Sequence, residues 1–259
     1  MNQVSEGGDA TRQTYEALAP SYEDFTLGYG YQYETWTATL LARAEAEGLQ
    51  GNRLLDVGCG TGFSFVLPLE RGWQVTGCDL SPAMIETARA KVGNRAELHV
   101  ADMRKLPDLG EFDLIWSINS PMSYLLTTDE LTATLAGMQR NLAPQGLVMF
   151  DLLSLKTAKT FFVDVLSVER GGKKFRWKGV LSADEVVPGV IGGGQLEEEG
   201  KDNPVDRHRM RHFAKAEVLA AIEAAGLRLA HALGEEDGDL HDPLDEEVHA
   251  TALYICRLA

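Results

Sequence analysis

Hydrophobic and polar positions along the middle of the chain follow the pattern of alternating β-strands and α-helices. Short apolar runs predict strands at residues 53–57, 74–79, 96–101, 112–117 and 147–153. Helical periodicity lies between them at residues 63–71, 84–91 and 129–142. Repeated βα units form a parallel sheet with right-handed crossovers. We therefore expect an α/β core that binds its ligand at the carboxyl ends of the strands.

The regions on either side of this core have different patterns. Residues 15–46 look helical, with a break around 26–30, and their many aromatic side chains suit a packing face or a lid. After a helix at 155–166, we expect strands at 174–181 and 185–191, a loop of three glycines, and a return strand at 207–213. The chain then closes with a helix at 215–225 and a hairpin of residues 227–233 and 249–258.

These elements predict a single domain over residues 1–259. Its expected parts are an N-terminal helical lid (1–50), a cofactor-binding core (51–153), an inserted antiparallel cap (154–213), and a C-terminal helix and hairpin (214–259). An insertion after the fifth strand overhangs the ligand side of such a sheet, so we expect it to cover the substrate.

A formal net charge of −15 argues against nucleic acid or an anionic membrane as the partner. We expect the protein to be a monomer or a homodimer. Cys59, Cys78 and Cys256 form no C-x-x-C pair, and the histidines show no repeated ligand spacing, so we expect neither disulfides nor a metal. The first residues carry no targeting pattern, which predicts a cytoplasmic protein.

The sequence Leu54–Phe63, LLDVGCGTGF, predicts a buried strand that turns sharply into a helix. Gly58 and Gly60, on either side of Cys59, let a ligand approach the backbone, and Asp56 adds a carboxylate beside the turn. A dinucleotide fold needs G-x-G-x-x-G, whose third glycine is replaced here by Phe63. The spacing therefore argues against NAD.

Acidic residues also end the next two predicted strands. Asp79 ends the second, where a carboxylate can accept both hydroxyls of a ribose. Asp102 ends the third, where it can accept from the amino group of adenine. Leu80, Met84 and Met103 are placed to sandwich the ring, although core packing explains Met84 and Cys59 equally well.

Four motifs in order, D-V-G-C-G-T-G, G-C-D-L-S-P-A-M, A-D-M-R and F-D-L-I-W-S-I-N-S, resemble those of class I S-adenosylmethionine-dependent methyltransferases. The N-terminal aromatic pattern and S-x-N-S-P-x-S-Y-L are similar to small-molecule members, the nearest being sugar-amine N-methyltransferases and uncharacterised bacterial relatives. Where some of the sugar enzymes carry a histidine, this chain has Tyr124.

The resemblance implies a Rossmann-like, mostly parallel sheet of seven strands in the order 3-2-1-4-5-7-6, with S-adenosyl-L-methionine as cofactor and an EC 2.1.1 type of activity. It also implies roles for individual residues. The glycine loop and Asp56 would hold the amino acid end of the cofactor, which Tyr22 and Trp36 would cover. Asn119 would lie near the reacting methyl group, and Tyr15 would line the reaction centre.

A methyl group on a sulfonium is already electrophilic, so the protein mainly aligns the reactants, and a base is needed only for a protonated acceptor. The candidates are Tyr124, His208 and His212. Alternation along the predicted return strand places the two histidines on one face. We expect catalysis from Tyr124 and His208, and substrate contacts from these two, Tyr15, Asn119 and His212.

The favoured function is methyl transfer to a small-molecule amine or hydroxyl. A first alternative is another reaction of the same cofactor, such as carbon-chain transfer or cyclisation. A second is an NAD-dependent oxidoreductase, which Phe63 disfavours. A protein that only binds its ligand is a further alternative.

Overall fold

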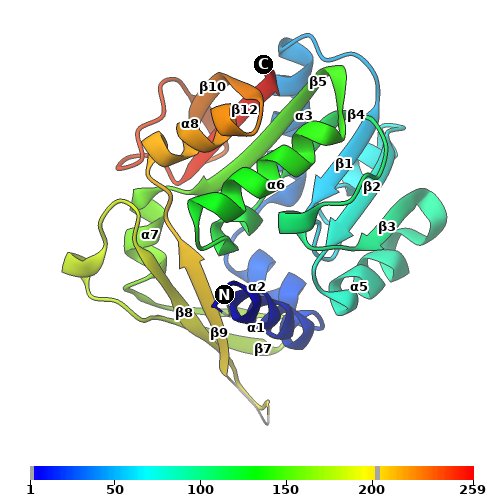
Figure 1. Cartoon of the computed structure of the whole chain (residues 1–259). Helices are drawn as coiled ribbons and strands as arrows, with labels where there is room; N and C mark the ends of the chain where they lie inside the picture. Colours follow the sequence, from blue (N-terminus) through cyan, green and yellow to red (C-terminus); the bar gives the residue numbers. More distant parts are fainter. Residues whose placement is uncertain (1–2, 202–204) are drawn as a thin grey trace.

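A computed structural model describes residues 3–201 and 205–259 (Figure 1). Residues 1 and 2 of the predicted lid, and 202–204 in the predicted cap, lie outside the described residues. The main sheet contains eight strands in the order β11-β10-β12-β5-β4-β1-β2-β3. Their bounds are β1 Arg53–Val57, β2 Gln74–Asp79, β3 Ala96–Val100, β4 Phe112–Ser117, β5 Leu142–Leu153, β10 Leu227–Glu236, β11 Asp239–His241 and β12 Thr251–Leu258.

The strands β1 to β5 are parallel, and β12 lies antiparallel between β5 and β10. This arrangement confirms the expected Rossmann-like class and strand order. The difference is β11, an additional short strand that pairs with β10 at the edge of the sheet. It lies between the two predicted strands of the C-terminal hairpin, 227–233 and 249–258.

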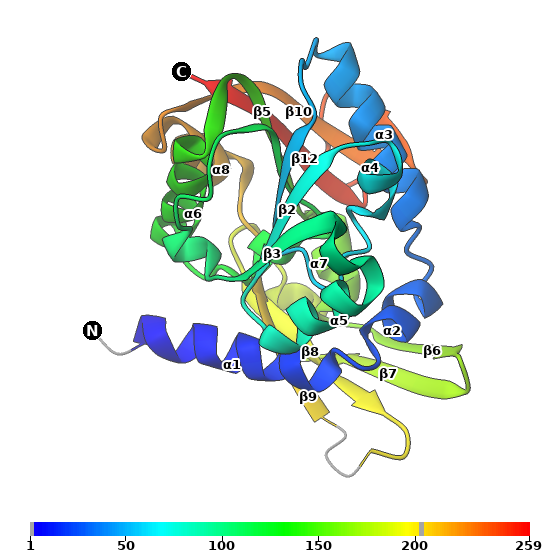
Figure 2. The same cartoon turned by 90° about the vertical axis from the view of Figure 1, so that its right-hand side faces the viewer.

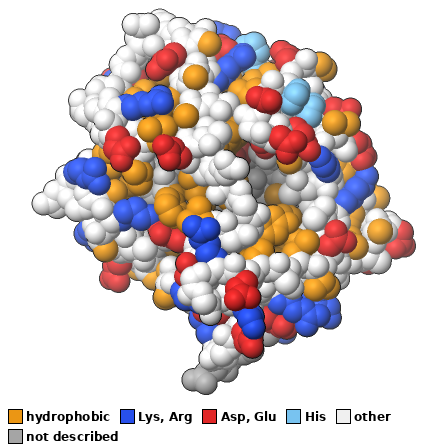
Figure 3. All heavy atoms as spheres, turned by 180° about the vertical axis from the view of Figure 1, so that it is seen from behind, with side chains coloured by type: hydrophobic (Ala, Val, Ile, Leu, Met, Phe, Trp, Pro, Cys, Tyr) orange, Lys and Arg blue, Asp and Glu red, His pale blue; other side chains and the backbone are white. Residues whose placement is uncertain are grey.

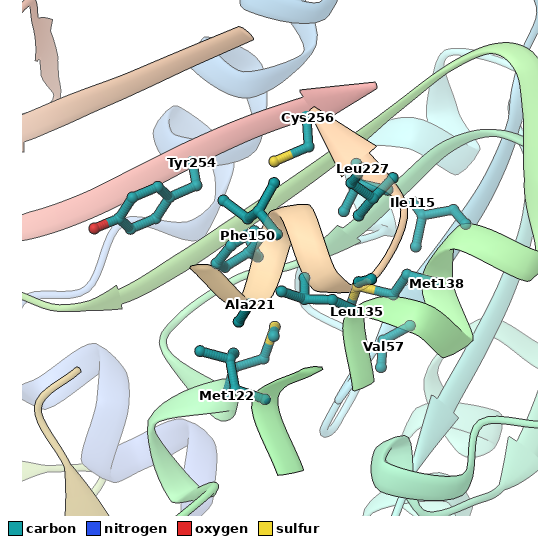
Figure 4. Close-up of a cluster of buried hydrophobic side chains, with 14 of the residues drawn as sticks. Val57, Ile115, Met122, Leu135, Met138, Phe150, Ala221, Leu227, Tyr254 and Cys256 are labelled. Carbon is teal, nitrogen blue, oxygen red and sulfur yellow. The ribbon is translucent and has the colours of Figure 1, made fainter. Parts of the chain in front are cut away.

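Helices cover both faces of the sheet (Figures 1 and 2). On one face lie α3 (Tyr33–Ala46), α4 (Val66–Glu70) and α5 (Pro82–Val92). On the other face lie α6 (Thr128–Arg140) and α8 (Lys215–Ala224), which pack with β4, β5 and β12 in the apolar cluster of Figure 4. Burial of this apolar surface on both faces makes the sheet the rigid centre of the molecule.

Local sequence signals fix the ends of the helices. The hydroxyl of Ser81 accepts from the amide of Met84 (3.3 Å), Pro82 begins α5, and Gly93 ends it at a φ of +62°. Thr127 caps α6 in the same way, by accepting from the amide of Glu130 (3.1 Å). These caps fix where each helix leaves the carboxyl end of a strand.

A second, four-stranded antiparallel sheet follows α7 (Leu155–Phe161). Its strands are β6 Val165–Arg170, β7 Lys173–Gly179, β8 Ile191–Glu198 and β9 Val205–Arg211. The N-terminal helices α1 (Gln3–Leu18) and α2 (Tyr22–Gly28) contact this sheet, and α1 also contacts α5 (Figure 2). Helix α1 thus bridges the two sheets below the carboxyl ends of β1 to β3.

The prediction of a strand at 185–191 followed by a glycine loop was wrong. Gly192, Gly193 and Gly194 lie inside β8, and their lack of side chains has a packing reason. A Cβ atom at Gly192 would lie 2.4 Å from the ring of Phe162, and one at Gly194 would lie 2.3 Å from Trp177. The glycines let two large aromatic rings lie directly on the strand.

Other predicted boundaries also differ, three of them as follows. Strand β5 begins at Leu142 and includes Pro144-Gln145-Gly146, because a register shift opposite β4 accommodates the extra residues. Residues 165 and 166 lie in β6 and not in a helix. The predicted helix 63–71 is reduced to Val66–Glu70.

Acidic and basic side chains are interspersed on the face of the molecule shown in Figure 3. Among the described residues, no helix is long and apolar enough to cross a bilayer.

Candidate active site

The glycine loop that follows β1 has a backbone that only glycine adopts readily. Gly58, Gly60 and Gly62 have φ values of +80°, +52° and +78°. The amides of Gly58 and Cys59 donate to the carbonyl of Cys78 on β2, at 2.8 and 3.0 Å. The loop is therefore fixed to the neighbouring strand, with its backbone exposed to the space beyond the sheet.

Space also requires glycine at position 58, since an added Cβ would lie 2.8 Å from the Cβ of Pro121. We expect Gly58→Ala to reduce the free energy of unfolding by about 3 kcal/mol, through backbone strain and overpacking. Urea denaturation measures this loss. Gly72→Ala is the matched control, because Gly72 has a φ of +81° and nothing within 4 Å of its added Cβ. Equal losses in the two variants would contradict the close approach to Pro121.

A cavity lies beside this loop, at the carboxyl ends of β1, β2 and β4 and against the N-terminal helices. Ten of the predicted site residues line it: Tyr15, Tyr22, Gly58, Gly60, Asp79, Leu80, Asp102, Met103, Asn119 and Tyr124. Residues from five separate stretches of the sequence therefore meet around one space. An elongated ligand with several polar groups suits such a lining.

Asp79 places a half-buried carboxylate between two backbone amides. Its oxygens accept from the amide of Gly60 (2.9 Å) and the amide of Ser81 (2.8 Å). Burial raises the pKa of the carboxyl, and the bonds from Ser81 and Gly60 act in the opposite direction. The carboxylate thus connects the glycine loop to the start of α5 and also borders the cavity.

Asp102 lies in a second acidic part of the lining, where Arg104 joins it to Glu130. Arg104 donates to both oxygens of the Asp102 carboxylate, from its guanidinium at 2.9, 3.1 and 2.6 Å and from its backbone amide at 3.0 Å, and to Glu130 at 3.1 Å. Partial burial opposes ionisation of Asp102, but the bonds from Arg104 outweigh it and lower the pKa. The carboxylate is therefore ionised and firmly oriented at neutral pH.

Hydroxyl groups from the lid meet the loop after β4. The side-chain amide of Asn119 donates to the hydroxyls of Tyr22 (3.1 Å) and Tyr33 (2.8 Å). These two hydroxyls are 3.1 Å apart. Tyr22 and Asn119 were predicted from the sequence as site residues, whereas Tyr33 was not. The aromatic character of Tyr33 alone did not distinguish it from packing residues.

Tyr124 connects the cavity to the cap. Its hydroxyl lies 2.6 Å from Nδ1 of His208, which comes from β9. His208 is buried, its ring is 5.0 Å from that of Trp177, and its Nε2 has no hydrogen-bond partner among the described residues. Burial lowers the pKa of His208 to about 4, so the imidazole is neutral near pH 7.

Six other predicted site residues do not line the cavity: Trp36, Asp56, Cys59, Met84, His208 and His212. His208 reaches the cavity through Tyr124, as described above. Cys59 and Met84 are buried beside the glycine loop and in α5. His212 comes directly after β9 and is buried, as His208 is, but its Nδ1 accepts from the amide of Gly189 at 3.2 Å, within the cap.

Asp56 lies below the glycine loop, where Ser64 donates to it. Burial raises its pKa to about 7, although the bond from Ser64 acts in the opposite direction. Because the pKa in the unfolded chain is near 4, the folded state holds the extra proton between about pH 4 and 7. This group therefore favours the folded state at low pH and loses that contribution as the pH rises toward 7.

We expect Asp56→Asn to remove this loss of stability with rising pH. The free energy of unfolding of the wild type, measured by urea denaturation from pH 5 to 8, should decline more than that of the variant by about 2–3 kcal/mol. Asp113→Asn is the control, because hydrogen bonds from Arg53 outweigh partial burial and lower the pKa of Asp113. Parallel pH profiles for the wild type and Asp56→Asn would contradict the prediction.

Arg104 and Asp151 were likewise not predicted from the sequence as site residues. Arg104 is the last residue of the quoted A-D-M-R motif and lines the cavity. Asp151 lies near the carboxyl end of β5, so the argument from strand ends that singled out Asp79 and Asp102 applies to it as well. Among the described residues, no cluster of potential metal ligands is present.

Comparison with known proteins agrees with this geometry. A sequence profile described as a methyltransferase domain matches residues 54–146. The chain is 30% identical over 227 residues to dTDP-3-amino-3,4,6-trideoxy-alpha-D-glucopyranose N,N-dimethyltransferase of Streptomyces venezuelae, covering 85% of this chain and 94% of that protein. It is 29% identical over 224 residues to the putative methyltransferase YqeM of Bacillus subtilis, covering 83% and 87%.

Solved structures give the same result. Streptomyces venezuelae DesVI superposes with a TM-score of 0.72 at 25% identity, covering 93% of this chain and 98% of that chain. An S-adenosylmethionine-dependent methyltransferase from Clostridium acetobutylicum gives a TM-score of 0.76 at 17% identity, with 92% and 96% covered. Together with the loop, the acids and the cavity, these matches show that the chain belongs to the class I S-adenosylmethionine-dependent methyltransferases and uses S-adenosylmethionine as its cofactor.

Proposed function

We propose that this methyltransferase acts on the amine nitrogen of a small molecule. The observation that carries the proposal is the neutral pair of Tyr124 and His208 at the cap side of the cavity. The bound cofactor supplies an electrophilic methyl group on a sulfonium. The residues around it then have to orient a nucleophile and keep out water.

The cofactor would lie along the glycine loop. Gly60 leaves room for it, because the nearest atom to an added Cβ there is a ring carbon of Tyr22 at 3.8 Å. We place the ribose at Asp79, where each carboxylate oxygen accepts from one amide and keeps an acceptor site for a hydroxyl, and the adenine beside Asp102 and Met103. Asn119 and Tyr22 would then border the methionine end. Asp56, Cys59, Met84 and Trp36 would support these residues from behind.

The acid–base properties of the acceptor side favour an amine over a hydroxyl. Burial raises the pKa of Tyr124 and lowers that of His208 to about 4, so neither is a strong base. The carboxylates of the lining are already engaged by the amides of Gly60 and Ser81 or by Arg104. An alcohol must lose its proton to react readily, whereas a neutral amine carries a free electron pair.

Burial also favours the neutral form of the amine itself. Its N–H group can donate to the oxygen of Tyr124, which His208 holds through the 2.6 Å hydrogen bond. Tyr15 packs edge-on against Tyr124, with ring centroids 5.3 Å apart, and closes this side. The pair would therefore orient the nitrogen and accept a hydrogen bond, while the cap sheet and α1 exclude water.

Amino sugars are the first class of acceptor to test. The Streptomyces venezuelae relative is named as an N,N-dimethyltransferase of an amino sugar carried on dTDP, and a Streptomyces fradiae relative that is 27% identical over 228 residues has a similar name. Tyr124, which stands where some sugar enzymes have a histidine, is itself bonded to a histidine from β9. The imidazole of His208 would thus lie near the position that the histidine has in those sugar enzymes, but it comes from β9.

The experiment measures release of S-adenosylhomocysteine from S-adenosylmethionine with a panel of acceptors. The panel pairs dTDP-amino sugars and free amines with the corresponding hydroxyl compounds. We expect turnover with an amine and none above background with its hydroxyl partner. Turnover with hydroxyl compounds alone would refute the proposal, and consumption of the cofactor without the thioether product would indicate another reaction type.

A further inference from the structure

The turn after β4 combines two unfavourable backbone conformations. Asn119 and Ser120 have φ values of +72° and +57°, in the left-handed region. Residues with a Cβ atom pay about 1–2 kcal/mol for this conformation, so consecutive examples persist only where the surroundings hold them. The turn leads directly into a 3-10 helix, Pro121–Tyr124, that carries Pro121 and Tyr124 to the cavity.

Asp151 holds this turn from the neighbouring strand. One of its carboxylate oxygens accepts from the amide of Asn119 at 2.9 Å, and the other accepts from the amide of Ser120 at 2.5 Å. The first oxygen also accepts from the indole nitrogen of Trp36 at 3.4 Å. The side chain is 1% exposed, so these donors stand in for water.

The carboxylate thereby connects three parts of the site. Trp36 belongs to α3, within the N-terminal lid, and Asp151 belongs to β5. Between them, the side chain of Asn119 faces Tyr22 and Tyr33 and lines the cavity. Burial raises the pKa of Asp151 to about 6, while bonds from the two amides and Trp36 act in the opposite direction. A charge that is costly to bury is thus retained where it fixes a strained turn.

We propose that Asp151 is a positioning residue of the cofactor site, which holds the left-handed turn Asn119–Ser120 and so places the Asn119 side chain against the cofactor. The proposal rests on the placement of the cofactor in this cavity and is independent of the acceptor. Both oxygens are needed, because each accepts from a different amide. An asparagine in this place turns its own N–H groups toward one of those donors.

The experiment measures the affinity for S-adenosylhomocysteine by calorimetry and the thermal unfolding midpoint of the same samples. We expect Asp151→Asn to weaken binding about tenfold. Glycine adopts a positive φ without strain, so adding Ser120→Gly to this variant should recover a large part of the affinity. A general structural role of Asp151 predicts no such recovery, because the side chain of Ser120 is no part of the carboxylate's contacts.

Asp113→Asn is the matched control. Asp113 also accepts from a backbone amide, that of Arg53 at 2.9 Å, but it lies near the start of β4 and does not line the cavity. It should leave the affinity unchanged. Should Asp151→Asn not fold, folding of the double variant with Ser120→Gly would support the proposal. Unchanged affinity in Asp151→Asn, loss without recovery in the double variant, or failure of both variants to fold would overturn it.

Discussion

Replacement of Asp79 by alanine is expected to weaken the binding of S-adenosylmethionine at least about a hundredfold. Among the described residues, this half-buried carboxylate is the acidic group that both borders the cavity and holds the glycine loop, through the amide of Gly60. Hydrogen bonds to a charged group contribute about 1.5–3 kcal/mol each, and a ribose offers two hydroxyls. Calorimetric titration of the variant with S-adenosylmethionine measures the loss.

Asp129→Ala is the control for this variant, since Asp129 is an exposed acid in the first turn of α6. It should bind the cofactor as the wild type does. Thermal unfolding of Asp79→Ala distinguishes lost ligand contacts from lost structure, because a folded variant that does not bind supports the ribose contact. Unchanged affinity in a folded Asp79→Ala variant would show that another group holds the ribose.

Replacement of Tyr124 by phenylalanine is expected to lower kcat for methyl transfer about a hundredfold and to change cofactor affinity less than threefold. The variant keeps the ring that packs against Tyr15 but loses the hydroxyl bonded to His208. Loss of a group that aligns the reacting atoms costs about 10²-fold in rate. Steady-state kinetics with an acceptor from the panel, together with calorimetry for the cofactor, separates the two effects.

Tyr254→Phe gives a matched comparison for this variant. Tyr254 is a buried tyrosine stacked on Phe150 in the core, and its hydroxyl has no partner among the described residues (Figure 4). It should retain wild-type kcat. If Tyr124→Phe keeps its kcat as well, the pair of Tyr124 and His208 does not orient the acceptor.

The cofactor half of the fold could be predicted from the sequence because each element there carries a local signal. The strands β1, β2 and β4 begin and end at the predicted residues, since apolar runs bounded by acids and glycines leave few alternatives. Asp79 and Asp102 meet beside the glycine loop because the ends of parallel strands share one edge of the sheet.

The cap could not be predicted as well, because its strands depend on contacts that are distant in the sequence. The glycines of β8 resemble a loop until Phe162 and Trp177 are known to pack on them. Likewise, alternation placed His208 and His212 on one face of the predicted return strand 207–213, but β9 ends at Arg211, and only the packing shows that His208 contacts Tyr124 while His212 contacts Gly189. Sequence periodicity predicts on which face of a strand a side chain lies. Its contacts with the site depend on where along the strand it lies, which periodicity does not predict.

The central claim is that the cavity brings a methyl donor to an amine held by Tyr124. In the most direct measurement, the protein is incubated with a dTDP-amino sugar and with S-adenosylmethionine that carries a trideuterated methyl group. The sugar is then analysed by mass spectrometry. We expect a sugar product that carries one or two labelled methyl groups on nitrogen, with one S-adenosylhomocysteine released for each methyl group. Label on a hydroxyl oxygen, or release of the thioether without label in the acceptor, would contradict it.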